Sequence, residues 1–183
     1  RVRKGEITFY NLDGDEIEKE LKTVEWDAEA AEKAGFEHFM IKEIHEQPKA
    51  VSDTLNSVVK DGAIDLSEVG LSEEEIKEIS QIYIVACGSA YHVGVAAQYV
   101  MEDLARIPVR VELASEFRYR NPILDPKGLV IIISQSGETA DSLAALRESK
   151  KQGVKTLGIV NVIGSSIARE ADNVFYTLAG PEI

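Results

Sequence analysis

The second half of the chain alternates strand-length aliphatic runs with segments that repeat apolar residues at helical spacing. The clearest run is residues 129–133, an unbroken and mostly β-branched series typical of a strand buried on both faces. Such alternation implies right-handed crossover connections and a largely parallel sheet with helices on both faces. The sequence therefore predicts an α/β fold in three layers, an αβα sandwich.

The expected elements of this fold follow from the same periodicity. Strands are expected at residues 82–86, 109–113, 129–133, 156–160 and 174–177. Helices are expected at residues 91–106, 115–119, 139–152 and 165–170. Ser72 and Glu75 form a capping-box pattern, which predicts a short helix before the first strand.

The N-terminal part of the chain has a different pattern. Asp13-Gly14 divides residues 6–18 into two strand-like runs, which predicts a β-hairpin. Residues 27–60 have helical spacing, and Gln47-Pro48 is expected to start a second helix because proline is tolerated in a first turn. Asp61-Gly62 is expected to end that helix. The α/β unit is thus expected to follow a hairpin and a helical linker.

Composition narrows the kinds of protein that this chain can be. With 44% apolar and 28% charged residues among 183, it has the composition of a folded protein with a sizeable core. The net charge of −12 argues against a nucleic-acid surface, and no apolar run approaches the ~18 residues of a membrane span. The single cysteine, Cys87, excludes an intramolecular disulfide and a cysteine-based zinc site, so a cytoplasmic location is expected. No metal or cofactor is expected.

Small polar residues follow three of the expected strands, where ligands of an open parallel sheet bind. The three loops are Cys87-Gly88-Ser89-Ala90, Ser134-Gln135-Ser136-Gly137-Glu138-Thr139 and Asn161-Val162-Ile163-Gly164-Ser165-Ser166. A chain this acidic cannot attract an anion by its overall charge. A phosphate would therefore need local donors, such as hydroxyls, backbone N–H groups and helix N-termini.

The second of these loops is the main candidate for a phosphate site. Ser134, Ser136 and Thr139 place three hydroxyls within six residues, and Gly137 permits a close approach of the backbone to a ligand. The helix expected to begin near Thr139 adds free N–H groups. The same residue types also form ordinary turns and N-caps, and Glu138 suits either capping or orienting the loop. The recurrence of such loops at one sheet edge favours a binding site.

Other interpretations of these loops fit less well. The chain contains no Gly-Lys-Ser/Thr end of a P-loop and no G-x-G-x-x-G fingerprint, and Ser136 lacks the G-x-S-x-G context of a hydrolase nucleophile. Cys87 is expected to line the site, with an inert core thiol and a nucleophile as alternatives. His38, His45 and His92 fall on separate expected helices, where packing or surface roles are expected. A place in the pocket is the alternative for His92, because it closely follows the Cys87 loop.

The run S-Q-S-G-E-T-A-D-S-L at residues 134–143, after a hydrophobic strand, resembles the signature of sugar isomerase (SIS) domains. Residues 38–48, 85–91 and 161–170 narrow the resemblance to the glutamine–fructose-6-phosphate aminotransferase family, also called glucosamine-6-phosphate synthases. In that family a glutaminase domain releases ammonia, and two SIS domains convert fructose 6-phosphate and the ammonia into glucosamine 6-phosphate. The resemblance covers nearly the whole chain and implies a flavodoxin-like SIS fold.

The resemblance also implies a division of the chain. Residues 1–26 are similar to the closing hairpin of the glutaminase domain, 27–75 to a helical linker region and 76–183 to the first SIS domain. Since the chain starts at Arg1 and stops after a strand, it is expected to be a piece of a longer protein. No catalytic residue is expected in it, because the family's glutaminase cysteine and its isomerising lysine, glutamate and histidine fall outside. The piece is expected to bind a sugar phosphate without turning it over.

The site residues come from the same resemblance. Phosphate is expected on Ser134, Gln135, Ser136 and Thr139, and the sugar side is expected along Cys87, Gly88 and Ser89. The ligand is expected to be fructose 6-phosphate, glucosamine 6-phosphate or glucose 6-phosphate. Many family members carry a hydroxyl at the position of Ala90, so one phosphate donor is expected to be missing here.

Partners and alternatives complete these expectations. SIS domains generally pair, so a homodimer is expected. One alternative is the sugar-phosphate-sensing SIS module of a regulator, for which a basic helix-turn-helix would replace the acidic hairpin and linker found here. Another is a stand-alone SIS isomerase, which would need an acid–base pair that the sequence does not show.

Overall fold

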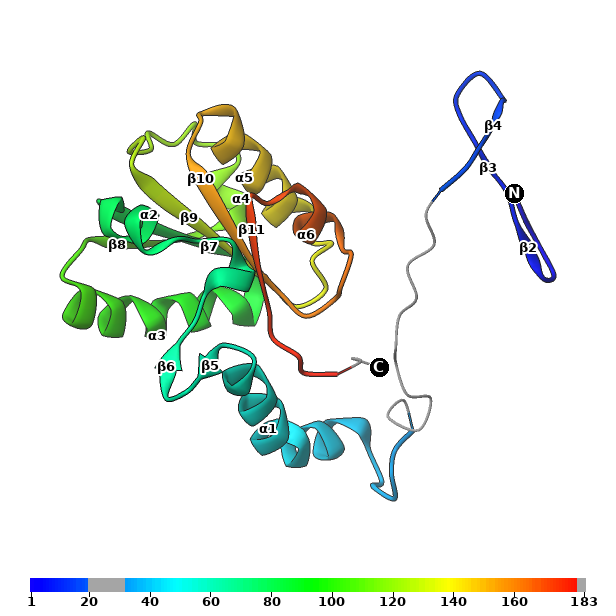
Figure 1. Cartoon of the computed structure of the whole chain (residues 1–183), viewed down its shortest axis with the longest axis horizontal. Helices are drawn as coiled ribbons and strands as arrows, with labels where there is room; N and C mark the ends of the chain where they lie inside the picture. Colours follow the sequence, from blue (N-terminus) through cyan, green and yellow to red (C-terminus); the bar gives the residue numbers. More distant parts are fainter. Residues whose placement is uncertain (20–31, 181–183) are drawn as a thin grey trace.

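A five-stranded parallel sheet forms the centre of the structure, a computed structural model that describes residues 1–19 and 32–180 (Figure 1). In spatial order its strands are β11 (Asn173–Tyr176), β10 (Lys155–Val160), β9 (Gly128–Ser134), β7 (Gln81–Ala86) and β8 (Val109–Leu113). All four pairings are parallel. This is the doubly wound flavodoxin-like order, in which the first strand lies between the second and the third. The α/β prediction is confirmed.

Helices cover both faces of the sheet. The helix α3 (Gly88–Ala105) packs on one face, against β7, β8 and β9. On the other face lie α4 (Ala114–Phe117), α5 (Ala140–Lys151) and α6 (Ser166–Glu170), and Figure 1 shows α5 and α6 on the side of the sheet opposite to α3. The chain therefore leaves β7 towards one face and leaves β9 towards the other.

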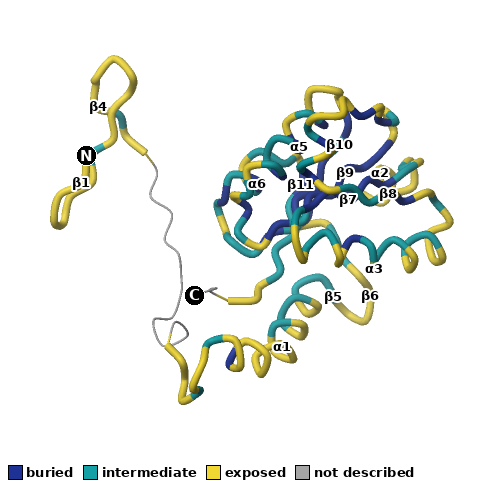
Figure 2. The backbone as a smooth tube through the Cα atoms, turned by 180° about the vertical axis from the view of Figure 1, so that it is seen from behind, coloured by how far each residue is buried: buried dark blue, intermediate teal, exposed yellow. Residues whose placement is uncertain are grey.

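The core consists of two apolar clusters separated by the sheet. Along β7, Tyr83 and Val85 point into the cluster under α5, whereas Ile82 and Ile84 point into the cluster on the α3 side. All four residues are buried. Figure 2 shows the central strands largely in dark blue, the colour of buried residues. Burial on both faces explains why the strands read as continuous aliphatic runs instead of alternating with polar residues.

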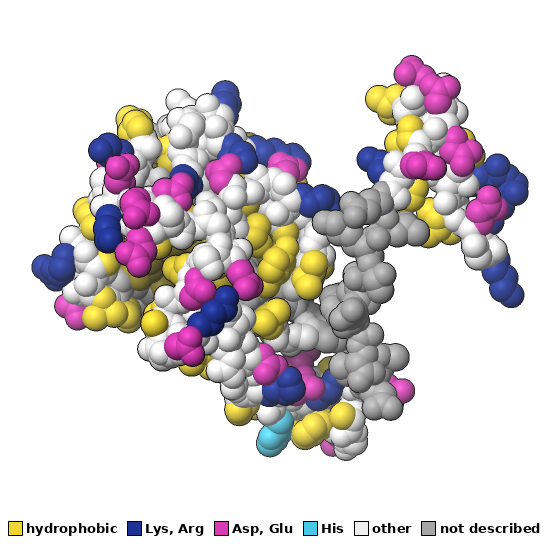
Figure 3. Space-filling model, viewed as in Figure 1, with side chains coloured by type: hydrophobic (Ala, Val, Ile, Leu, Met, Phe, Trp, Pro, Cys, Tyr) yellow, Lys and Arg dark blue, Asp and Glu magenta, His cyan; other side chains and the backbone are white. Residues whose placement is uncertain are grey.

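Charged side chains of both signs are interspersed over the surface seen in Figure 3. The Arg147 guanidinium donates two hydrogen bonds to the Glu170 carboxylate, at 2.8 and 2.7 Å, and joins α5 to α6. Arg118, which follows α4, pairs with Asp141 of α5 at 2.6 Å. These pairs join the three helices of one layer to one another. No helix within the described part of the chain is long and apolar enough to cross a membrane.

The N-terminal residues form two small hairpins where one was expected. They pair β1 (Val2–Arg3) with β2 (Glu6–Ile7), and β3 (Phe9–Tyr10) with β4 (Glu16–Ile17). The turn at Asp13-Gly14 is as predicted, but the run at residues 6–10 is divided between the hairpins. Gly5, with φ of +83°, allows the additional turn that brings the Thr8 N–H within 2.9 Å of the Arg1 carbonyl.

The linker region contains one long helix instead of two. The helix α1 (Phe39–Asn56) continues through Pro48, so the predicted start of a second helix at Gln47-Pro48 is wrong. Pro48 is exposed and removes only the hydrogen bond that its own nitrogen would donate, and the helix continues around it. The part of the expected first helix that falls on residues 20–31 lies outside the described residues.

Asp61-Gly62 has a different role from the predicted helix end. The pair forms the tight turn between β5 (Val59–Lys60) and β6 (Ala63–Ile64), with φ of +53° and +79°. Positive φ at both central residues is typical of the two-residue hairpin turns that Asp-Gly favours. The capping box is confirmed: Ser72 Oγ accepts the Glu75 N–H and starts α2 (Glu73–Glu78).

We expect Tyr83→Phe to lower the free energy of unfolding by about 1–2 kcal/mol, because it removes two buried hydrogen bonds. The Tyr83 hydroxyl donates to Gln81 Oε1 and accepts the Asp125 N–H, both at 3.0 Å, and the side chain is 2% exposed. Urea unfolding measures the loss. Tyr99→Phe on α3 is the control, since Tyr99 is 71% exposed and its replacement should change stability little. Equal losses in the two variants would contradict this role of Tyr83.

Candidate functional site

The loop after β9, residues 134–139, is folded around the hydroxyl of Ser134. This Ser134 Oγ accepts the Gly137 N–H at 3.1 Å and lies 3.1 Å from the Thr139 hydroxyl. Ser134 itself is buried, whereas Thr139 is half-buried at the N-cap of α5. The contact with Ser134 holds the Thr139 hydroxyl at the N-terminus of α5, next to the first free N–H groups of that helix. We call residues 134–139 the β9 loop.

The remaining residues of the β9 loop face outward to different degrees. Ser136 is half-buried, and its Oγ accepts the Glu138 N–H at 3.2 Å. Gln135 is exposed, and its main-chain carbonyl accepts the main-chain N–H of Asn161 at 3.0 Å. The loop thus presents hydroxyls and a carboxamide at the positive end of α5, which is an arrangement suited to an anion.

Gly137 fits closely against the loop that precedes α6. An ideal Cβ at this position would lie 2.1 Å from Ser165 Oγ and 2.5 Å from Ser165 Cβ. Its φ of +66° lies in the left-handed region that side chains disfavour. Its carbonyl accepts the Ile167 N–H at 3.0 Å. Both conformation and space therefore require glycine here.

Glu138 connects the β9 loop to the beginning of α6. Its carboxylate accepts the Ser166 N–H at 2.6 Å, so it caps α6 and not the helix that it precedes. Hydrogen bonding to Ser166 holds the pKa of the Glu138 carboxyl below its ordinary value of 4.5. The sequence left two roles open for Glu138, capping and orienting the loop. This contact serves both, because it caps α6 and also anchors the β9 loop, which precedes α5.

The residues after β7 lie at the same edge of the sheet. Cys87 is the N-cap of α3 and packs partly buried against the core cluster on the α5 side. Gly88 is exposed with a φ of +57°, and Ser89 is exposed in the first turn of α3. Since β7 and β9 are neighbours whose connections leave towards opposite faces, a crevice opens between their ends, where ligands of doubly wound sheets bind.

A hollow of about 350 Å³ joins the β7 and β9 ends on the α3 side. Its polar wall comes from Ser89 together with Ser134, Gln135, Asn161 and Thr177. Ala90, Val93, Ile133, Ile159 and Val160 form the apolar part. None of these described lining residues carries a titratable side chain, so the hollow offers hydrogen bonds and apolar contacts.

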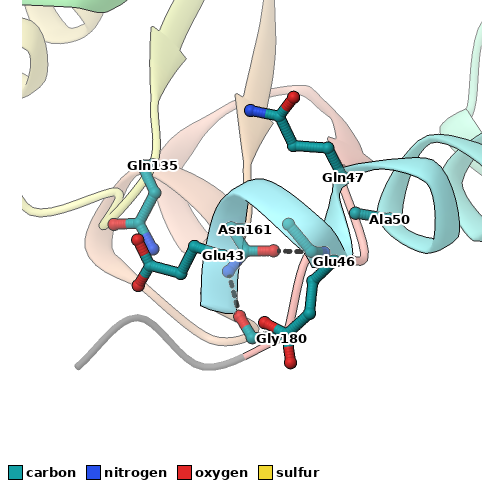
Figure 4. Close-up of a pocket in the computed structure, with 8 residues that line it drawn as sticks. Glu43, Glu46, Gln47, Ala50, Gln135, Asn161 and Gly180 are labelled. Atoms are coloured by element: carbon teal, nitrogen blue, oxygen red, sulfur yellow. Dashed lines mark hydrogen bonds between the residues drawn. The ribbon is translucent and has the colours of Figure 1, made fainter. Parts of the chain in front are cut away.

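A second hollow, of about 240 Å³, lies between α1 and the ends of β9 and β10 (Figure 4). The helix contributes Glu43, Glu46, Gln47 and Ala50, and the strand ends contribute Gln135, Asn161, Ala179 and Gly180. Gln135 and Asn161 line both hollows. Sequence reasoning missed the α1 residues, because their position depends on how the helix docks.

The structure brings together some of the predicted site residues and separates others. Ser134, Ser136 and Thr139 gather in the β9 loop, and Ser89 lies across the α3-side hollow from Ser134 and Gln135. Cys87 packs against the core instead of lining either hollow. The sequence predicts only that Asn161 belongs to a polar loop. Its position directly after a strand is the signal that could have indicated a role in the site wall. Within residues 1–19 and 32–180, no three His, Cys, Asp or Glu side chains are grouped as metal ligands.

A family model and several known proteins match this chain. The family model described as SIS domain matches residues 75–183, more than half of the chain. The chain belongs to the SIS domain family. It is also 57% identical over 97% of its length to glutamine–fructose-6-phosphate aminotransferase [isomerizing] of Clostridium acetobutylicum, and it spans 29% of that relative.

Two solved structures show how the fold recurs. The C-terminal domain of glucosamine-fructose-6-phosphate aminotransferase from Francisella tularensis matches with a TM-score of 0.78 and 46% identity, over 83% of this chain and 43% of that one. The sugar isomerase domain of an RpiR transcription factor from Sphaerobacter thermophilus matches with a TM-score of 0.59 over 75% of this chain and 74% of that one. At 23% identity, the latter shows the fold alone.

We expect Gly137→Ala to disrupt the β9 loop and to lower the free energy of unfolding by roughly 2–4 kcal/mol, from overpacking and backbone strain together. Chemical denaturation measures the loss, and amide NMR shifts of residues 134–139 and 165–167 report the local change. Gly153→Ala is the control, because Gly153 also has a positive φ, of +75°, but an added Cβ there meets open space. If both variants lost the same stability, the close packing on Ser165 would be irrelevant.

We expect Glu138→Gln to destabilise the protein at neutral pH and to match the wild type at low pH. A lowered pKa means that the folded state favours the ionised carboxyl, so the stabilisation is fully present above about pH 4.5 and is lost as the pH falls through the lowered value. Urea unfolding of both proteins between pH 7 and pH 3 measures the gap. A gap that stays constant with pH would contradict the role of the charge.

Proposed function

We propose that the chain binds a sugar phosphate, with the phosphate on the β9 loop and the sugar in the crevice between the β7 and β9 ends. The observation that carries this proposal is the set of hydroxyls held at the N-terminus of α5 at the topological switch of a SIS domain. Neutral donors suit the site, because a chain with a net charge of −12 offers no general attraction for an anion.

Each residue has a role in this proposal. The phosphate accepts hydrogen bonds from the loop residues Ser134, Gln135, Ser136 and Thr139 and from the first N–H groups of α5. The sugar side lies along Cys87, Gly88 and Ser89. Of these, Ser89 lines the crevice directly, and Cys87 supports the start of α3. Ala90 lies in the same wall without a hydroxyl, so it contributes only apolar surface.

The ligand proposed is fructose 6-phosphate, glucosamine 6-phosphate or glucose 6-phosphate. The Clostridium acetobutylicum relative carries fructose 6-phosphate in its name, and the likeness to it covers 97% of this chain. The hollow on the α3 side is lined by uncharged residues, which supports a role in binding and orientation. We therefore propose that proton transfer to the sugar requires groups other than those lining this hollow.

We further propose that the chain is the sugar-phosphate-binding part of a glucosamine-6-phosphate synthase, an enzyme that makes glucosamine 6-phosphate and glutamate from fructose 6-phosphate and glutamine. In this proposal residues 1–26 close a glutaminase domain, 27–75 form the linker region and 76–183 form the first SIS domain. The location is cytoplasmic and the protein is a homodimer. Two findings support this division. The SIS family model matches residues 75–183, and the likeness to the Clostridium acetobutylicum relative extends to residues before them.

A sugar-phosphate-sensing module of a regulator is the alternative. The RpiR domain supports the shared fold but no shared ligand, since its identity to this chain is 23%. The 57% identity to an aminotransferase extends over 178 residues and so includes segments before the SIS domain. That extent favours the enzyme.

The proposal predicts that fructose 6-phosphate shifts the backbone amide NMR signals of residues 87–89 and 134–139, with a Kd of about 1 mM or about −4 kcal/mol. A Ser136→Ala, Thr139→Ala double variant should weaken binding at least 10-fold, because it removes two donors to a charged group. Titrations with glucose 6-phosphate and inorganic phosphate separate the sugar contribution from the phosphate contribution.

Ser67→Ala provides the matched control. Ser67 is an exposed serine in the 3-10 helix at Ser67–Val69, which packs near the start of β11 at the opposite edge of the sheet. Its replacement should leave the titration unchanged. The proposal fails if the loop signals do not move at saturating ligand, or if the double variant binds as tightly as the wild type.

A further inference from the structure

Asn161 is the first residue after β10, and it is half-buried between two other segments of the chain. On one side its backbone N–H donates to the Gln135 carbonyl of the β9 loop at 3.0 Å. On the other side its side chain reaches the residues that follow β11, as Figure 4 shows. Asn161 therefore stands between the proposed phosphate loop and the chain beyond the last strand.

Three hydrogen bonds hold residues 177–180 to this side chain. Asn161 Nδ2 donates to the Gly180 carbonyl at 2.6 Å. Asn161 Oδ1 accepts the Ala179 N–H at 2.8 Å and the Thr177 hydroxyl at 3.2 Å. A donor and an acceptor on one short side chain are needed to satisfy both a carbonyl and an N–H. A carboxamide provides them on two separate atoms, whereas a carboxylate has no donor and a hydroxyl has both functions on a single oxygen.

The same segment is also fixed to β10 and to α1. The Thr177 N–H donates to the Val160 carbonyl at 3.0 Å. The Thr177 carbonyl accepts the hydroxyl of Thr54, in the last turns of α1. The segment 177–180 thus contacts both β10 and α1, two elements that are far apart in the sequence.

Both hollows at the sheet edge depend on this arrangement. Gln135 and Asn161 belong to the wall of each hollow, Thr177 completes the one beside α3, and Ala179 and Gly180 complete the one beside α1. A shift of residues 177–180 relative to Gln135 would change the shape of both. The bonds of Asn161 are the direct link between these two parts of the wall.

We infer that Asn161 is a positioning residue, which couples the β9 loop to residues 177–180 so that a sugar phosphate held on the loop also orders the segment after β11. This inference rests on the proposed sugar-phosphate site. By linkage, a segment held in place by Asn161 favours the ligand to the same degree as the ligand favours the segment. Asn161 acts through the Gln135 main-chain carbonyl on one side and through Thr177, Ala179 and Gly180 on the other.

The test is an amide NMR titration of the whole 183-residue chain with fructose 6-phosphate. In the wild type, the signals of Ala179 and Gly180 should shift together with those of the β9 loop and with the same Kd. In Asn161→Ala the loop signals should still shift, with a Kd raised roughly 3- to 10-fold, as expected for the loss of a few hydrogen bonds. The Ala179 and Gly180 responses should disappear.

A conservative variant separates the role of Asn161 from simple loss of folding. Asn161→Asp keeps the acceptor for the Ala179 N–H and loses the donor to Gly180, so Ala179 should keep its response and Gly180 should lose it. Asn56→Ala, which changes an exposed asparagine in the last turn of α1, should behave as the wild type. A merely structural role would lower stability in the Asn161 variants without this selective pattern.

The outcomes distinguish the inference from the proposed function. If the β9 loop signals do not respond in the wild type, the proposed site itself is wrong. If they respond while Ala179 and Gly180 stay unchanged in the wild type, the coupling is overturned and the site stands. The coupling is also overturned if Asn161→Ala responds at Ala179 and Gly180 as the wild type does. The wild-type titration decides whether the two segments are coupled, and Asn161→Asp tests the part of Asn161 if Asn161→Ala fails to fold.

Discussion

All five strands of the sheet run in one direction, and helices cover both of its faces. Because the strands are parallel, their carboxyl ends, and the loops that follow them, all lie at the same end of the sheet. The central strands β7 and β9 are neighbours, but the chain leaves them towards opposite faces and continues to strands on opposite sides of the pair, β8 and β10, and this opens a crevice between their carboxyl ends. The position of the candidate site, its hydroxyls and its neighbouring hollows all follow from that topology.

Within this crevice the β9 loop is held by hydrogen bonds inside the loop and by a bond to the next loop. Ser134 binds across the loop to Gly137 and Thr139, and Glu138 reaches to the start of α6. The acidic residues beside the loop are engaged: Glu138 with Ser166, and Asp141 with Arg118. A loop already held in one shape loses little entropy when it binds a ligand, which strengthens binding.

The walls of the hollows beside the candidate site are not confined to the SIS domain. Helix α1 lies before the matched residues 75–183, yet it forms one wall of a hollow and is bonded to the segment after β11 through Thr54. Most residues of α1 are exposed, as its largely yellow tube in Figure 2 shows. The same edge therefore combines loops of the parallel sheet with a segment from the linker region. Asn161 is the residue at which these contributions meet.

The sequence by itself determined the layers, the parallel strands and the β9 loop, because buried aliphatic runs and small hydroxyl residues act through local periodicity and turn chemistry. Local patterns also misled: Pro48 does not start a helix, and Asp61-Gly62 makes a hairpin turn where a helix end was expected. Only the tertiary structure decided that Asn161 joins Gln135 to residues 177–180 and that α1 closes a hollow. Those contacts connect residues far apart in sequence, and a spacing rule carries no information about which distant segments pack together.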